Sequence, residues 1–150
     1  MGAGIRYVRG EREVTDSAVT RPDPMVTQDN EFFWEAAAHH RLVAQRCTRC
    51  HVFRHPPRPR CPHCGSFETD VVELSGRGAV YSWAVLHHPQ NPAFDYPVKA
   101  ALIDLEEGVR IVSNLVGVEP GEIEIGMPVS VIFVPTAGGN AVPVFEAVTR

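Results

Sequence analysis

The stretch CTRCHVFRHPPRPRCPHC, from Cys47 to Cys64, contains all four cysteines of the chain, in the pairs Cys47/Cys50 and Cys61/Cys64. Each C-x2-C pair presents two thiolates from one tight turn, and two facing pairs supply the four sulfurs that a tetrahedral structural zinc prefers. Because no cysteine is left over, the pattern predicts one closed zinc site that builds the fold rather than an open site that reacts.

Other uses of four cysteines are less favoured. Two disulfides would require an oxidising compartment, and the first ten residues, MGAGIRYVRG, are too poor in apolar residues for a secretory signal. A thioredoxin-like redox site would need one pair instead of two. Iron suits the same four sulfurs, so an electron carrier stays open as an alternative, although the short spacer and the surrounding Arg and His residues favour zinc.

Length and charge set further bounds. The 150 residues suffice for one compact domain or two very small ones, and no run of 18 apolar residues predicts a membrane span, so we expect a cytoplasmic protein. The formal net charge is -4, yet residues 36–67 contain no acid. The six arginines of that segment are Arg41, Arg46, Arg49, Arg54, Arg58 and Arg60. Such a basic region can attract phosphates or an acidic partner surface, although arginines can also simply solvate a small ribbon.

The sequence divides into four segments. Residues 1–28 mix charges with Thr and Pro and lack a sustained apolar period, which predicts a flexible N-terminal arm. Asp29 as N-cap and acids followed by bases predict a helix over residues 29–41. Residues 42–69 form the predicted zinc ribbon. Within it, the prolines of His55 to Arg60 exclude a helix and predict a stiff extended arch.

Residues 70–150 are predicted to form a small barrel. Short β-branched segments alternate there with glycine-containing turns, including a hairpin turn at Gly108 and a bulge or bend at Gly76 to Gly78. The predicted strands are Val71–Leu74, Ala79–His87, Val98–Leu105, Val109–Val116, Val129–Val134 and Pro143–Val148. The predicted fold is therefore mainly β, with an N-terminal helix, a four-cysteine zinc ribbon and a five-stranded OB-fold barrel.

Several segments resemble the domain of unknown function 35 family, whose members are OB-fold proteins with a rubredoxin-like zinc ribbon. The resemblance is carried by Phe33-Trp34-Glu35, Leu42 to Cys50, Pro56-Pro57-Arg58, Cys61 to Gly65, Ser75 to Ser82, Pro97 to Gly108 and Gly126 to Val129. One departure is His51, which stands where a glycine often follows the second cysteine of the first turn.

The resemblance implies a function in acyl-CoA metabolism. Family members are small subunits bound to thiolase-superfamily proteins, including aldolases that cleave steroid side chains. The resemblance therefore implies an accessory subunit of a thiolase or retro-aldolase of lipid or steroid side-chain catabolism. Such a subunit stabilises its partner, shares the acyl-CoA with it and forms a hetero-oligomer, for which we expect two copies of each chain.

The residues themselves indicate binding more than catalysis. All cysteines are assigned to the metal, and no nucleophile elbow, phosphate loop or dinucleotide fingerprint is present. The loop residues His87 and His88 near Asp95 form a weak acid/base candidate, so whether the chain is itself catalytic stays open. The predicted CoA or partner contacts are Arg58, Arg60, Arg77 and Trp83, since guanidinium groups fork onto phosphate oxygens and tryptophan often anchors interfaces. Packing within the barrel is an equal alternative for Trp83.

The competing class is a nucleic-acid-binding zinc-ribbon and OB-fold protein. Such a protein should show a basic barrel face with aromatic residues that stack on bases. The region after Ala101 instead carries seven acids against Arg110 and Arg150. Nucleic acid is therefore the less favoured partner.

Overall fold

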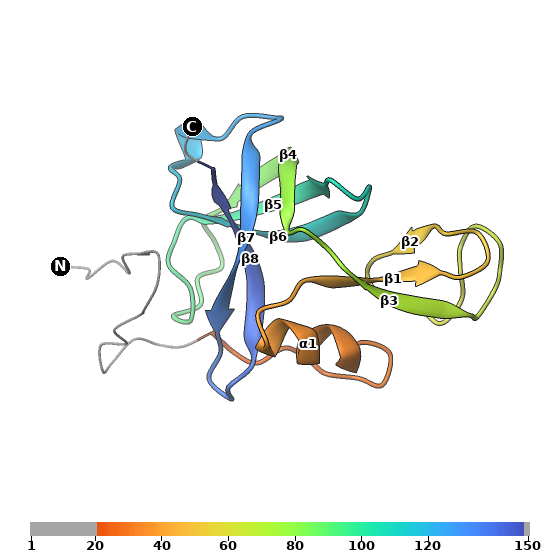
Figure 1. The fold of residues 1–150 in the computed structure, drawn as a ribbon. Coiled ribbons are helices and arrows are strands. Elements are labelled where there is room, and N and C mark those ends of the chain that lie inside the picture. Colours follow the sequence, from red (N-terminus) through yellow and green to blue (C-terminus); the bar gives the residue numbers. More distant parts are fainter. Residues whose placement is uncertain (1–20, 149–150) are drawn as a thin grey trace.

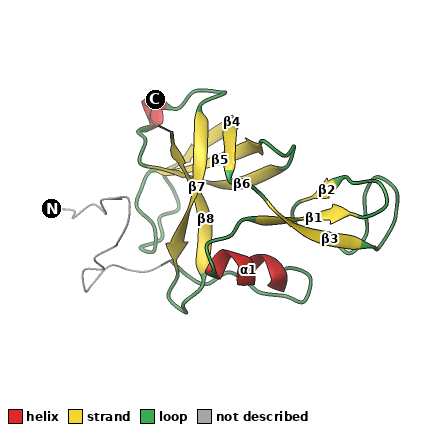
Figure 2. Ribbon diagram, in the orientation of Figure 1, coloured by secondary structure: helices red, strands yellow, loops and turns green. Residues whose placement is uncertain are grey.

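The computed structural model describes residues 21–148, which are dominated by strands (Figures 1 and 2). The elements in chain order are α1 (Glu31–Ala38), β1 (Val43–Cys47), β2 (Phe53–Arg54), β3 (Thr69–Glu73), β4 (Arg77–Leu86), β5 (Val98–Leu105), β6 (Arg110–Val116), the short 3-10 helix η1 (Pro120–Glu122), β7 (Pro128–Pro135) and β8 (Ala141–Ala147). Neither helix of the described range is long and apolar enough to cross a membrane.

The helix α1 is shorter than the predicted range of residues 29–41. Its N-cap is Asn30, not Asp29, and it ends because His40 adopts a left-handed backbone with φ of 59°. The His40 N–H donates to the Ala37 carbonyl and the Arg41 N–H to the Ala36 carbonyl, both at 2.9 Å, which is the hydrogen-bond pattern of a Schellman cap. The basic residues expected in the last helical turn therefore form the cap instead.

A three-stranded antiparallel sheet forms the ribbon, with β1 between β2 and β3. The strand predicted at Val71–Leu74 as the start of the barrel lies at Thr69–Glu73 and pairs with β1 from Cys47↔Thr69 to Val43↔Glu73. Most of its side chains are exposed, so it has no apolar face to contribute to a barrel. The ribbon sheet projects from the rest of the molecule (Figure 1).

The remaining strands close a barrel in the order β4-β5-β6-β8-β7, in which the single parallel pair joins β6 to β8. Its strands match the predicted ones to within two residues at each end, and Gly108 turns between β5 and β6 with φ of 81°. The bulge lies between Val80 and Ser82 rather than at Gly76 to Gly78. Gly78 is needed for close approach, since a Cβ there would lie 2.4 Å from the Asp104 carbonyl oxygen.

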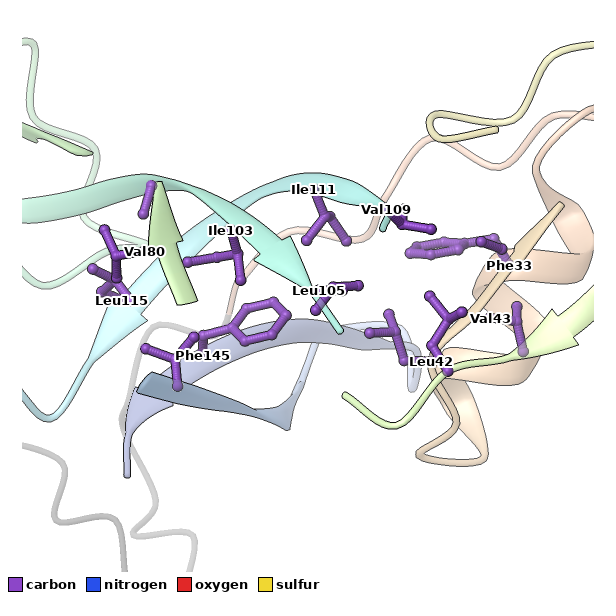
Figure 3. Close-up of a cluster of buried hydrophobic side chains, with 14 of the residues drawn as sticks. Phe33, Leu42, Val43, Val80, Ile103, Leu105, Val109, Ile111, Leu115 and Phe145 are labelled. Atoms are coloured by element: carbon purple, nitrogen blue, oxygen red, sulfur yellow. The ribbon is translucent and has the colours of Figure 1, made fainter. Parts of the chain in front are cut away.

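One hydrophobic core runs from the barrel to the helix (Figure 3). Phe145 and Ile103 are fully buried in the barrel, and the same cluster continues to Phe33 of α1 and to Leu42 and Val43 at the start of β1. The helix and the first half of β1 therefore belong to the barrel's core.

The outer ribbon has no comparable core. Between residues 45 and 73 the only buried hydrophobic residues are Cys47 and Cys61. The ribbon beyond Ala44 is therefore held by its sheet hydrogen bonds, by whatever the cysteines bind and by the packing of the partly buried Phe53 and of His55 on the core.

Part of the predicted arm packs on the barrel. Arg21 donates to the side-chain oxygen of Asn114 at 3.0 Å, and the Asp23 carboxylate accepts hydrogen bonds from Thr136 and Asn140 in the turn between β7 and β8. The rest of the arm, residues 1–20, lies outside the described residues.

Candidate functional site

The four cysteine sulfurs converge on one point at the end of the ribbon. All four Sγ atoms lie within 4.8 Å of one another, and the Cys47–Cys64 and Cys50–Cys61 sulfur pairs are each 3.6 Å apart. Four sulfurs at about 2.3 Å from a tetrahedral zinc would be about 3.8 Å apart, so the geometry fits the ion. The same separations exclude disulfides, whose sulfurs lie about 2.05 Å apart.

The two cysteine turns have the same backbone geometry. The His51 N–H donates to the Cys47 carbonyl and the Gly65 N–H to the Cys61 carbonyl, both at 2.9 Å. Both donors have positive φ, 62° for His51 and 75° for Gly65. His51 thus takes the conformation for which its counterpart is glycine, at a cost of roughly 1–2 kcal/mol, and the turn keeps its shape.

Electrostatics in the cluster favour a bound dication. The backbone N–H groups of Cys64 and then His63 lower the pKa of Cys61 to about 6, against an opposing effect of burial. At Cys50 the Val52 N–H lowers the pKa, but burial and the three other thiols outweigh it and raise the value to about 12. Four thiolates therefore cannot coexist here without a cation to balance them.

Two of the predicted binding residues lie beside the second cysteine turn. Arg58 and Arg60 are exposed on the arch and line a shallow cavity of about 520 Å³ together with Pro62, His63, Gly65 and two of the metal ligands, Cys61 and Cys64. No Asp or Glu lines this cavity. The Arg60 Nε donates to the Gly65 carbonyl at 3.1 Å, which holds that side chain against the turn.

Arg77 lies elsewhere, at the start of β4, and does not line that cavity. Its guanidinium forms two hydrogen bonds to the Glu106 carboxylate, at 2.8 and 3.1 Å, which raise the pKa of Arg77. The Arg77 charge is therefore already paired.

Trp83 lies midway along β4, opposite Ala101 of β5, with 38% of its surface exposed. Tyr81 and Leu86 of the same strand are also exposed, but Leu86 is three residues from Trp83 and lies on the opposite face of the strand. β4 pairs with β7 only at Arg77–Ala79, so the second edge of Ser82–Leu86 has no strand partner among residues 21–148. We call the exposed Trp83 and this open edge the β4 surface.

The weak acid/base candidate is not assembled. His87, His88 and Asp95 are exposed, and no described hydrogen bond or ion pair joins either histidine to the carboxylate. Sequence reasoning also missed that Arg54, one residue of the basic segment, is buried and bonded to the arch.

Comparisons with known proteins agree with this architecture. The family described as "ChsH2, rubredoxin-like zinc ribbon domain" matches residues 34–70, and "ChsH2, C-terminal OB-fold domain" matches residues 71–134. A DUF35 domain-containing scaffold protein of Pyrococcus furiosus is 38% identical over 95 residues, which are 62% of this chain and 68% of the relative. The chain belongs to the DUF35 family of zinc-ribbon and OB-fold proteins, and its four cysteines form a site for one structural zinc.

Other similar proteins are named as enzymes or as subunits of enzymes. A probable enoyl-CoA hydratase alpha subunit of Thermomonospora curvata is 53% identical over 126 residues, or 84% of this chain. The chain spans only 40% of that relative's length. The benzoylsuccinyl-CoA thiolase subunit BbsA of Thauera aromatica is 36% identical over 51% of this chain and 52% of the relative. Among solved structures, a chain of the Ltp2-ChsH2(DUF35) aldolase superposes with a TM-score of 0.78 at 51% identity, over 83% of this chain and 98% of that one.

Proposed function

We propose that this chain is an accessory subunit of a thiolase-superfamily acyl-CoA enzyme, either a thiolase or a retro-aldolase of lipid or steroid side-chain catabolism. The observation that carries the proposal is the 51% identity to a chain of the Ltp2-ChsH2(DUF35) aldolase, because the match covers 98% of that chain. The thiolase subunit among the relatives supports the same class of partner.

The proposed role is to hold the partner and the CoA thioester. Arg58 and Arg60 contact CoA phosphates, since both are exposed beside an acid-free cavity and guanidinium groups bind phosphate oxygens in pairs. Arg77 takes part only where a phosphate displaces Glu106 from its guanidinium. Bond cleavage belongs to the partner, which supplies the reacting groups.

The β4 surface is the proposed contact with the partner. Its exposed tryptophan is a residue type that interfaces often bury at their energetic centres. The unpaired edge of the same strand adds backbone groups that a partner can satisfy. The assembly contains two copies of each chain.

The test is to purify the tagged full-length chain from its native host with zinc retained. We expect a stoichiometric thiolase-superfamily protein, a mass by light scattering that fits two copies of each, and cleavage of an acyl-CoA carbon–carbon bond. Trp83→Ala should reduce the recovered partner at least tenfold, whereas the control Met25→Ala, also at an exposed apolar residue, should not. Co-purification of nuclease-sensitive nucleic acid without such a partner would refute the proposal.

A further inference from the structure

A buried cation lies beneath the exposed arginines of the arch. Arg54 of β2 is only 2% exposed, and its Nη1 donates to the Arg58 carbonyl at 3.2 Å and to the Pro59 carbonyl at 3.3 Å. No described carboxylate forms an ion pair with it, and its Nε and Nη2 have no protein acceptor within residues 21–148. Burial of a charge without a counter-ion is strongly unfavourable, so a small domain retains one only where something offsets the cost.

A second buried polar side chain holds the same point of the arch. Gln45 of β1 lies directly opposite Arg54 in the ribbon sheet and is 9% exposed. Its Oε1 accepts the hydrogen bond of the Arg58 N–H at 2.9 Å. The two buried side chains therefore hold the backbone of Arg58 on both sides, while the Arg58 side chain itself stays exposed.

The hydrogen bonds that Arg54 donates are directed at the arch. Both of its protein hydrogen bonds go to carbonyl groups of the arch, which has no regular secondary structure of its own. Its charge lies in the acid-free segment and in a medium of low polarizability, where a field is screened less than in water. Arg54 therefore acts on the surface that Arg58 and Arg60 present in two ways, through the backbone that it holds and through its positive charge.

We infer that Arg54 and Gln45 are positioning residues for a phosphate-binding arch. They hold the backbone at Arg58 in the orientation that directs its guanidinium to the phosphates of CoA, and Arg54 adds positive potential from below. Pre-organisation of this kind increases affinity because the ligand no longer has to order the segment that binds it. The inference rests on the proposed function, since it assigns the CoA contact to the arch.

The test is a titration of the zinc-loaded full chain with CoA, followed through the backbone amide NMR signals of His55, Arg58 and Arg60, the residues of the arch that are not proline. Arg54→Lys keeps the charge, but its ammonium lies one bond nearer the backbone than the Nη1 that donates to both carbonyls, so those hydrogen bonds are lost or lengthened and the Kd should rise about tenfold. Arg54→Met removes the charge as well, so it should weaken binding further and flatten the dependence of Kd on salt concentration. Arg49→Gln is the control, because it removes one exposed charge of the same segment from the first cysteine turn and not from the arch, and its Kd should change less than about twofold.

Gln45→Met provides an independent variant that leaves all charges in place. It removes the acceptor of the Arg58 N–H, so we expect about fivefold weaker CoA binding with an unchanged salt dependence. Zinc content and thermal unfolding are measured for each variant. If Arg54→Lys loses zinc or fails to fold, Gln45→Met alone tests the positioning role.

The outcomes separate the inference from the proposed function. If the double variant of Arg58→Ala with Arg60→Ala weakens CoA binding but Arg54→Lys and Gln45→Met bind as the wild type does, the positioning role is refuted and the arch remains a CoA contact. If CoA leaves the amides of His55, Arg58 and Arg60 unshifted in the wild type, the arch is not the CoA contact and the inference falls. Recovery of the thiolase-superfamily partner is measured separately, so the accessory-subunit proposal can survive either result.

Discussion

Removal of zinc should unfold the outer ribbon and leave the barrel folded. Between residues 45 and 73 the only buried hydrophobic residues are two of the metal ligands, whereas Leu42 and Val43 at the start of β1 lie in the barrel's core. A structural zinc contributes about 10 kcal/mol or more to ribbon-sized units at pH 7. No apolar burial in the outer ribbon could replace that contribution.

The measurement is hydrogen exchange by mass spectrometry, before and after zinc is removed with a chelator. With zinc, the amides paired between β1 and β3 should be protected from exchange by several kcal/mol. Without zinc, the exchange rates of residues 46–70 should lie within roughly a few factors of ten of those of an unfolded chain. Trp34 of α1 and Trp83 of β4 are the chain's two tryptophans and both lie outside the ribbon. The fluorescence of Trp83 should therefore stay native while the metal leaves, whereas Trp34 packs on Phe33, which contacts His55 of the ribbon, and can report its loss.

Two results would refute this reasoning. Simultaneous exposure of both tryptophans on zinc release would show that ribbon and barrel unfold as one cooperative unit, despite the gap in the buried core. Unchanged protection of residues 46–70 in the metal-free protein would show that the sheet hydrogen bonds alone hold the ribbon. Return of protection on adding zinc is the control that the chelator caused no irreversible damage.

Two further predictions concern single side chains. His51→Gly removes a left-handed backbone strain of roughly 1–2 kcal/mol, against a glycine entropy cost of roughly 0.5–1 kcal/mol. Zinc affinity should therefore rise about fivefold in a chelator competition. An unchanged or lower affinity would contradict this prediction. Hydrogen bonds from Thr136 and then Asn140 lower the pKa of Asp23. The contribution of Asp23 to the free energy of unfolding is therefore complete above its pKa in the unfolded chain, near 3.9, and is lost as pH falls through its pKa in the folded protein. Asp23→Asn should abolish this acid-side loss in thermal melts between pH 2 and 6, and an identical pH profile in the variant would exclude the tether as its source.

The features that sequence predicted are those that depend on local pattern. Cysteine spacing identified the metal centre because two C-x2-C turns leave little geometric choice, and the sulfurs do converge. The strand Val98–Leu105 was predicted with its bounds because a short apolar segment ends at the turn that contains Gly108. The family resemblance and the zinc ion are confirmed by the matching ribbon and barrel domains.

The features that sequence did not predict depend on partners distant in the chain. Arg77 was expected to be available for phosphate, but Glu106, 29 residues later, pairs with it because the turn between β5 and β6 lies beside the start of β4. Arg54 carried the same charge pattern as its neighbours, and only the fold shows that it is buried under the arch. The strand Thr69–Glu73 was assigned to the barrel because composition does not specify which sheet a strand joins.

The two proposed contact surfaces are joined rigidly, which has a consequence for how the subunit works. β1 runs from the buried Val43 in the barrel's core to Cys47 in the metal centre, so one strand fixes the ribbon's direction. The connection to β4 is fixed as well, because the Ser75 N–H donates to the Glu107 carboxylate at 2.6 Å and Arg77 pairs with Glu106 in the same turn. In the proposed complex, a partner held at the β4 surface would meet the arch at a position set by these two connections. The proposed subunit, which has no assembled acid/base pair among residues 21–148, would in this way orient the CoA thioester for its partner.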